Sequence, residues 1–255
     1  MEKKYKFTEE TRIYNGRLLH RIVAIRDFSS IIAGTKGGWI EKEDNLSHEG
    51  DCWVSDEAIV CDKACVFENA IVAGNAIVEK CGHVFGYARV SGAALVGERA
   101  NVYGNSMIGM DAVIDGNVFI YGRARVSRSA HVTGKAYVGD NTLIEGHAIV
   151  EGGFIYGQTV IEGNARVTGK VVIDGMAYIC GNAVIAKNED FIVFKNWWSS
   201  SRYFTWTRSN DKYKVGCFYG TGEELIEAAY NHDEKRGREY ERIVNYVNSI
   251  KNDGN

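Results

Sequence analysis

The sequence has no proline among its 255 residues and no long hydrophobic run. Without proline, the turns must be made by glycine, asparagine and aspartate, and glycine is abundant at 29 residues. No stretch approaches the roughly 20 apolar residues of a membrane span, and residues 1–7 lack the apolar segment of a signal peptide. We therefore expect a cytoplasmic protein that does not contact a membrane.

Motifs for metal or nucleotide chemistry are also missing. The six cysteines form no CxxC pair, which favours free thiols in a reducing compartment. There is no P-loop, GxGxxG or HExxH motif, and no Cys/His cluster has the spacing of metal ligands. The formal net charge of −3 gives no excess that would favour nucleic acid or a membrane surface. We expect no metal site and no resident cofactor.

A β-branched residue recurs at every sixth position through the middle of the chain. From Val54 to Val150 all seventeen such positions are valine or isoleucine. The register then slips by one residue, and six more positions follow from Ile155 to Ile185. The residue two positions before each of these valines or isoleucines is usually small, and the residue two positions after it is often glycine. The repeating unit is therefore Ala-x-Val-x-Gly-x.

This unit predicts a triangular solenoid. In an extended strand, residues two apart point to the same side, so the alanine and the valine both face inward. Glycine tolerates the positive φ of the sharp turn that follows. Three hexads close a coil of 18 residues, and 23 hexads give nearly eight coils. We predict a mainly β protein whose residues 52–187 form a parallel β-helix.

The repeat resembles the hexapeptide-repeat superfamily of left-handed β-helices, and the left-handedness is implied by that resemblance alone. The segments AGTKGGWI, NLS and GDCWVSDEA resemble the start of a family of poorly characterised bacterial and phage hexapeptide-repeat proteins. This likeness covers about residues 5–185, and some members are labelled transferases on fold alone. Residues 1–51 are expected to form an N-terminal β-hairpin cap, with Trp39 and Trp53 plugging the first coil.

Outward residues fall into three columns, which define three faces of the prism. The first column runs from Trp53 to Tyr178, and the second from Cys65 to Val172. The third face carries an apolar series that we call the aliphatic column: Ile59, Ile77, Leu95, Val113, Ile149 and Val184. An apolar strip of this length favours an interface, so we expect a homo-oligomer, either a dimer or a trimer. Strand propensity alone, or coverage by the C-terminal segment, would also explain it.

A further column at one corner of the second face is aromatic. Its members recur once per coil, with one gap at Gly139: Phe67, Phe85, Tyr103, Tyr121 and Tyr156. We expect these rings to stack along the axis of the prism. A surface for a ligand or a partner is the alternative interpretation.

Residues 188–255 predict a C-terminal α+β module of a β-hairpin and two helices. Thr221 and Glu224 have the spacing of a capping box at the first helix. The module resembles tails of phage and prophage proteins. Its basic and aromatic residues are candidates for partner binding: Trp197, Trp198, Arg202, Tyr203, Trp206, Arg208, Lys212 and Lys214. Simple packing of a small sheet, or nucleic-acid binding, are the alternatives.

Two functions remain open. We favour a non-enzymatic scaffold of phage or mobile-element type, whose C-terminal module binds a host protein such as a defence factor. The alternative, implied by the superfamily, is an acyl-CoA-dependent acyltransferase with a histidine base between subunits. His131 in the third column is then the catalytic candidate. No inserted loop interrupts the repeats to build an acceptor site, which weakens the enzymatic alternative.

Overall fold

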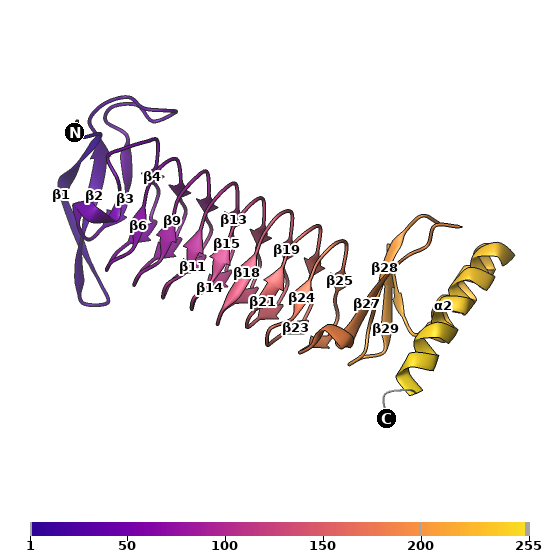
Figure 1. Ribbon diagram of the computed structural model, residues 1–255. Helices are drawn as coiled ribbons and strands as arrows, with labels where there is room; N and C mark the ends of the chain where they lie inside the picture. The colour runs from indigo at the N-terminus through magenta and orange to yellow at the C-terminus, as the bar shows by residue number, and fades with distance from the viewer. Residues whose placement is uncertain (1, 199, 253–255) are drawn as a thin grey trace.

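The hexads fold into short strands that stack as three parallel sheets around one axis (Figure 1). The computed structural model describes residues 2–198 and 200–252. The first face has eight strands, so the prism has about eight turns. Strands 18 residues apart are neighbours in the central coils, as in the pairing of Ile77 with Leu95. The predicted parallel β-solenoid is therefore confirmed.

The strands of the prism are two or three residues long. The first face comprises β4 (Trp53–Val54), β7 (Ile71–Val72), β10 (Arg89–Val90), β13 (Met107–Ile108), β16 (Arg125–Val126), β19 (Leu143–Ile144), β22 (Val160–Ile161) and β25 (Tyr178–Ile179). The second comprises β6 (Cys65–Val66), β9 (His83–Val84), β12 (Asn101–Val102), β15 (Phe119–Ile120), β18 (Ala136–Val138), β21 (Gly153–Ile155) and β24 (Val172–Ile173). The third comprises β5 (Ile59–Val60), β8 (Ile77–Val78), β11 (Leu95–Val96), β14 (Val113–Ile114), β17 (His131–Val132), β20 (Ile149–Val150), β23 (Arg166–Val167) and β26 (Val184–Ile185).

The interior of the prism is built as the repeat predicts. The alanine and the valine of a hexad, such as Ala76 and Val78, are both fully buried. Each coil is hydrogen-bonded to the next through its backbone, for example from Ile77 N to Ala94 O at 2.9 Å. The one-residue slip is absorbed where Gly153 pairs with Ala136, so the strands continue across it.

The aromatic corner stacks as expected. Ring centroids lie 4.7 Å apart for Phe67 and Phe85, and 4.9 Å apart for Phe85 and Tyr103. The gap at Gly139 has a physical reason, because a Cβ there would lie 2.3 Å from the ring of Tyr121. Tyr121 therefore lies over the glycine and fills the position where the next ring would stack.

The N-terminal cap extends the sheet of the third face. Strands β1 (Tyr5–Tyr14) and β2 (Arg17–Ala24) form the predicted hairpin, and β3 (Lys36–Ile40) pairs in parallel with β5. A short 3₁₀ helix, η1 (Glu43–Asn45), follows. Trp53 is buried in the first coil as expected, with its ring 5.4 Å from that of Phe28. The expectation for Trp39 was wrong, because this ring packs outside the prism beside Leu19 and Ile59.

The C-terminal module packs on the other end of the prism (Figure 1). An antiparallel sheet of four strands is followed by two helices, and a 3₁₀ turn precedes it. The elements are η2 (Asn188–Asp190), β27 (Phe191–Lys195), β28 (Tyr203–Thr207), β29 (Lys212–Val215), β30 (Phe218–Gly220), α1 (Gly222–His232) and α2 (Glu234–Asn252). The capping box is present, because Thr221 Oγ1 accepts from Glu224 N at 3.2 Å. Neither described helix is both long enough and apolar enough to cross a membrane.

The module also caps the last coil. Backbone N–H groups at the end of a solenoid have no further coil to bind, and side chains of the module accept these hydrogen bonds instead. Thr205 Oγ1 accepts from Tyr178 N at 2.8 Å, and Ser209 Oγ accepts from Val184 N at 2.7 Å. The module nevertheless has a core of its own, which includes Trp206.

Candidate functional site

The aliphatic column is partly covered by the chain itself. Ile59 is only 6% exposed, and both Ile59 and Ile77 pack in a cluster with Leu19 of the N-terminal hairpin. The next three members, Leu95, Val113 and Ile149, are half-buried without that cover, and Val184 is 43% exposed. The covering segment is N-terminal, whereas the alternative weighed from the sequence was C-terminal. An interface with a second copy through the remaining members stays a prediction.

His131 forms a pair with a carboxylate on the third face. Its Nε2 lies 3.2 Å from Asp115 Oδ1, and both side chains are a little over one-third exposed. A carboxylate beside an imidazole fixes the orientation of the ring. Such a pair has the composition of a general base with its orienting group. It lies on an open face between Val113 and Ile149, so a second subunit would be needed to enclose it.

Three of the predicted partner-binding residues serve the fold of the module. Trp206 is fully buried, and its Nε1 donates to Asp211 Oδ1 at 2.8 Å. Arg208 Nε donates to the backbone oxygen of Glu189 at 3.2 Å. Lys212 lies 3.8 Å from a carboxylate oxygen of Glu224. These contacts match the packing alternative that the sequence left open.

Three aromatic members lie on the surface instead. Trp197 is 64% exposed, Trp198 is 67% exposed and Tyr203 is 38% exposed. The Nζ of Lys195 lies 3.5 Å from the ring centroid of Trp197 and 4.8 Å from that of Tyr203. The end of this strand and the start of the following loop therefore present two exposed tryptophans, and a cation lies over the ring of the first. We call Lys195, Trp197, Trp198 and Tyr203 the tryptophan patch.

A groove next to the tryptophan patch joins the module to the prism. It has a volume of about 370 Å³, and Arg202, Tyr203 and Lys214 line it together with Met176 and Tyr178 of the last coil. Lys214 Nζ lies 4.7 Å from the ring centroid of Tyr178. Burial raises the pKa of the Tyr178 hydroxyl, which therefore stays protonated at neutral pH. We call this the junction groove.

Sequence reasoning brought Arg202, Tyr203 and Lys214 together but missed Tyr178. Tyr178 was placed in the outward column of the first face, and only the packing of the module against the last coil brings it to Lys214. The same limit applies to His232 and Arg236, which line a second cavity inside the module. The positions of these two residues in the sequence do not indicate a shared site, because the cavity forms only when the helices cover the sheet.

One cluster of potential metal ligands lies under the N-terminal hairpin. Cys61, Asp62 and Glu79 bring one ligand atom each within 4.8 Å of one another. However, Arg17 Nε already bonds Asp62 Oδ1 at 2.6 Å, and burial raises the pKa of the Cys61 thiol to about 12. A thiolate is the form that binds metals, so this cluster is better explained as an ion pair beside a buried thiol.

The fold and repeat place the chain in the class of hexapeptide-repeat β-solenoids. No protein-family model matches the chain. A segment of 63 residues is 43% identical to a curated protein described as uncharacterized acetyltransferase YdcK, from Escherichia coli strain K12. The similarity covers 22% of this chain and 19% of that protein. The chain thus matches about a fifth of the length of this relative, and the similarity is local.

Proposed function

We propose that this is a non-enzymatic binding protein, in which a rigid prism carries a C-terminal module that binds a partner protein. The observation that supports this most is the exposure of Trp197 and Trp198, each about two-thirds open to solvent. Tryptophan is the residue type most enriched in the energetic centres of protein interfaces. Two adjacent tryptophans that lie outside the core of the module and are exposed to solvent favour an interface.

The charge of the module indicates which kind of partner surface would complement it. Between residues 191 and 220 the module has five basic residues and one acidic residue. Lys195, Arg202 and Lys214 lie around the tryptophan patch and the junction groove. An acidic protein surface with exposed apolar side chains complements this arrangement. Nucleic acid is disfavoured by the net charge of −3, although stacked bases would also suit aromatic rings beside cations.

In this proposal the prism acts as a rigid spacer. Its backbone is hydrogen-bonded from coil to coil and its interior is fully buried, so the module is held at a fixed distance from the N-terminal cap. If copies associate through the free part of the aliphatic column, several modules would act together and gain avidity. A phage origin and a host defence factor as the partner remain predictions from the resemblance of the tail.

The test uses affinity capture from an extract of the source organism, followed by reconstitution with the purified partner. The baits are the wild-type chain, the double variant Trp197→Ala/Trp198→Ala, and Tyr87→Ala as a matched control. Tyr87 is an aromatic residue of the prism that is 63% exposed. We expect the double variant alone to lose the partner. Capture that disappears on nuclease treatment would instead show that nucleic acid is bound.

A second candidate function is acyl transfer from acyl-CoA, with His131 as general base. It is supported by the His131–Asp115 pair and by the name of the partly similar protein. In this function His131 takes a proton from a hydroxyl or amine acceptor while Asp115 orients the ring. Acetyl-CoA should then raise the melting temperature, and His131→Ala should abolish transfer whereas His83→Ala should not. No thermal shift at millimolar acetyl-CoA would argue against this function.

A further inference from the structure

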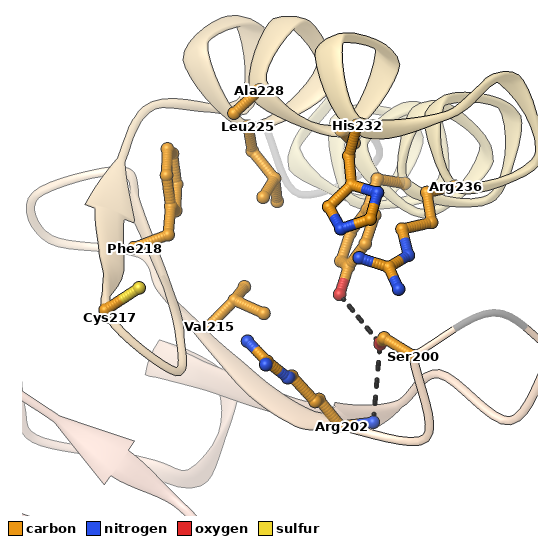
Figure 2. A pocket seen from close by; sticks show the side chains of 11 residues that line it. Ser200, Arg202, Val215, Cys217, Phe218, Leu225, Ala228, His232 and Arg236 are labelled. Carbon is orange, nitrogen blue, oxygen red and sulfur yellow. Dashed lines mark hydrogen bonds between the residues drawn. The ribbon is translucent and has the colours of Figure 1, made fainter.

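A cavity of about 230 Å³ lies inside the C-terminal module, between its sheet and its two helices (Figure 2). Val215, Leu225, Ala229 and Tyr240 form its floor and are almost fully buried as part of the core of the module. The wall continues with Phe218 of β30. The inside of this cavity is therefore apolar and suits a hydrocarbon or an aromatic group.

The mouth of the cavity is cationic. Arg202 comes from the sheet side, and His232 and Arg236 come from the helices opposite (Figure 2). No acidic residue is among the described residues that line the cavity. The guanidinium of Arg202 makes no hydrogen bond or ion pair with the described part of the chain. Arg236 is partly neutralised, because its Nε lies 3.3 Å from Asp233 Oδ2.

Two hydroxyl groups are held in place at the same mouth. Ser200 Oγ and Tyr240 Oη lie 3.1 Å apart, and Ser200 Oγ also accepts from Arg202 N at 3.4 Å. These contacts hold the loop before β28 against α2 and fix the backbone from which the Arg202 side chain extends. Positively charged and polar groups at the mouth of an apolar cavity suit an amphipathic anion.

The size of the cavity favours one side chain over a cofactor. Sites for small molecules generally occupy about 300–1,000 Å³, so this cavity is smaller than most of them. One leucine or phenylalanine side chain fits it, and the cations at its mouth require a negative charge very close to that side chain. A carboxyl-terminal residue carries both groups on one Cα atom. An acidic side chain would have to come from a neighbouring residue.

We propose that this cavity binds the carboxyl-terminal residue of the partner protein, with a large apolar side chain inside and its α-carboxylate on Arg202 and Arg236. The proposal rests on the proposed function and names the chemistry of the partner. Arg202 also lines the junction groove, so the chain that precedes this terminus has a direct route toward the tryptophan patch. The apolar side chain acts as the anchor, and the carboxylate sets the direction of the partner chain.

The experiment is a fluorescence anisotropy titration with labelled pentapeptides on the full chain. The probe Gly-Ser-Gly-Ser-Leu is used with a free carboxyl terminus, and the same peptide with a terminal amide is the matched ligand. We expect the amide to bind at least about tenfold more weakly, because hydrogen bonds to a charged group are lost. A peptide ending in lysine should bind no better than the amide.

Two variants test the apolar inside and the cationic mouth of the cavity separately, and a third is the control. Ala228→Trp fills it from an exposed position of α1, and Arg202→Gln/Arg236→Gln removes the cations. Both should reduce binding of the free acid at least about tenfold. Arg238→Gln is the control, because Arg238 is exposed on α2, the helix that carries Arg236, and pairs with Glu234. Melting temperatures within a few degrees of wild type show that each variant is folded.

Several outcomes would overturn the proposal. These are equal affinity for acid and amide, tighter binding of an amidated peptide with an internal Glu-Leu pair, or no binding up to millimolar protein. The Trp197→Ala/Trp198→Ala variant keeps the two proposals apart. If it loses the captured partner while the cavity variants keep it, the cavity proposal fails and the proposed function stands. If no captured partner depends on the tryptophan patch but the free acid binds selectively, the proposed function fails and the cavity proposal stands.

Discussion

At the scale of single residues, the turns of the prism explain the richness in glycine. From Val54 to Ile179, the residue two positions after each inward valine or isoleucine adopts a positive φ, and most of these residues are glycine, such as Gly104 at +72°. Several are not, and Met110 and Arg128 adopt φ of 55° and 58° at the same position of the repeat. The backbone of the neighbouring coils imposes the turn there, at a cost that a side chain normally avoids.

Replacing a turn glycine should therefore destabilise the prism. In Gly104→Ala the new Cβ would lie 3.0 Å from backbone atoms of Gly122, in addition to the unfavourable φ. We expect a loss of about 1–2 kcal/mol, seen as a lower melting temperature by circular dichroism. Gly97→Ala is the control, since a Cβ there meets no atom within 4 Å and the φ is ordinary. Equal melting temperatures for the two variants would refute this explanation of the turns.

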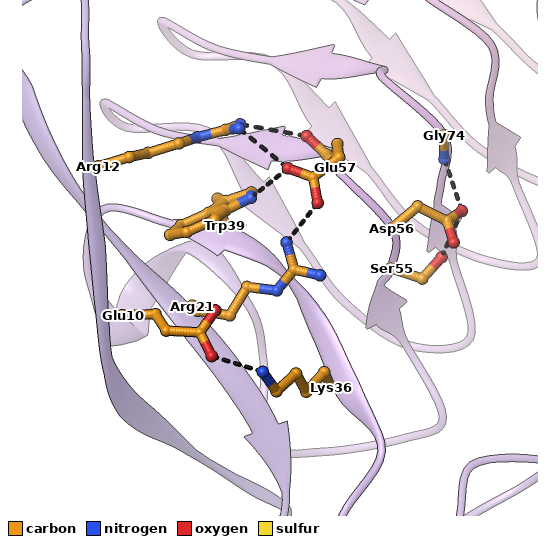
Figure 3. A network of polar contacts seen from close by, with 9 residues as sticks. All are labelled: Glu10, Arg12, Arg21, Lys36, Trp39, Ser55, Asp56, Glu57 and Gly74. Carbon is orange, nitrogen blue, oxygen red and sulfur yellow. Dashed lines mark hydrogen bonds and ion pairs between the residues drawn. The ribbon is translucent and has the colours of Figure 1, made fainter.

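At the scale of elements, a polar network fastens the N-terminal hairpin to the first coil (Figure 3). Glu57 accepts from Arg21 at 2.7 Å, from Trp39 Nε1 at 2.9 Å and from Arg12 at 3.1 Å. Both guanidinium groups also lie within 5.0 Å of the ring centroid of Trp39. One carboxylate thus links both strands of the hairpin to the prism and holds the cover over Ile59 in place.

This network should make the attachment of the hairpin depend on pH. Hydrogen bonds from Arg21 and Trp39 hold the pKa of Glu57 below its ordinary value of 4.5. The stabilisation is then present above about pH 4.5 and is lost as the pH falls through the lower folded-state pKa. We expect Glu57→Gln to melt about 1–3 °C below wild type at pH 7, and this difference to shrink toward pH 3.

The control for this prediction is Glu9→Gln. Glu9 lies on the same hairpin, is exposed and makes no ion pair with the described residues. Its substitution should leave the melting temperature unchanged at both pH values. A difference between Glu57→Gln and wild type that stays constant from pH 7 to pH 3 would contradict the assigned role of the carboxylate.

At the scale of the whole molecule, features that repeat along the chain could be predicted, whereas features built from segments distant in the sequence could not. The hexads fixed the parallel sheets, the inward residues and the stacked corner, because each depends only on spacing along the chain. Trp39 and Tyr178 were misplaced or missed because their partners come from the hairpin and from the module. The C-terminal cavity was invisible for the same reason, since it needs the helices to lie across the sheet.

The predicted partner-binding set shows the same division. Trp206 and Trp197 belong to one run of basic and aromatic residues, yet the first is buried and the second is 64% exposed. Trp206 lies in β28, where every residue from Phe204 to Thr207 is buried, whereas Trp197 and Trp198 lie in the loop that precedes the strand. Composition alone could not separate a core residue of the module from a surface residue.

The central claim is that function lies in the C-terminal module and not on the faces of the prism. Quantitative capture with four baits tests it directly: wild type, Trp197→Ala/Trp198→Ala, His131→Ala and Tyr87→Ala. We predict that one partner is enriched at least about tenfold on wild type, His131→Ala and Tyr87→Ala relative to the double variant, and that it re-forms a complex from purified components. Equal recovery on all four baits, or loss on His131→Ala alone, would contradict the claim.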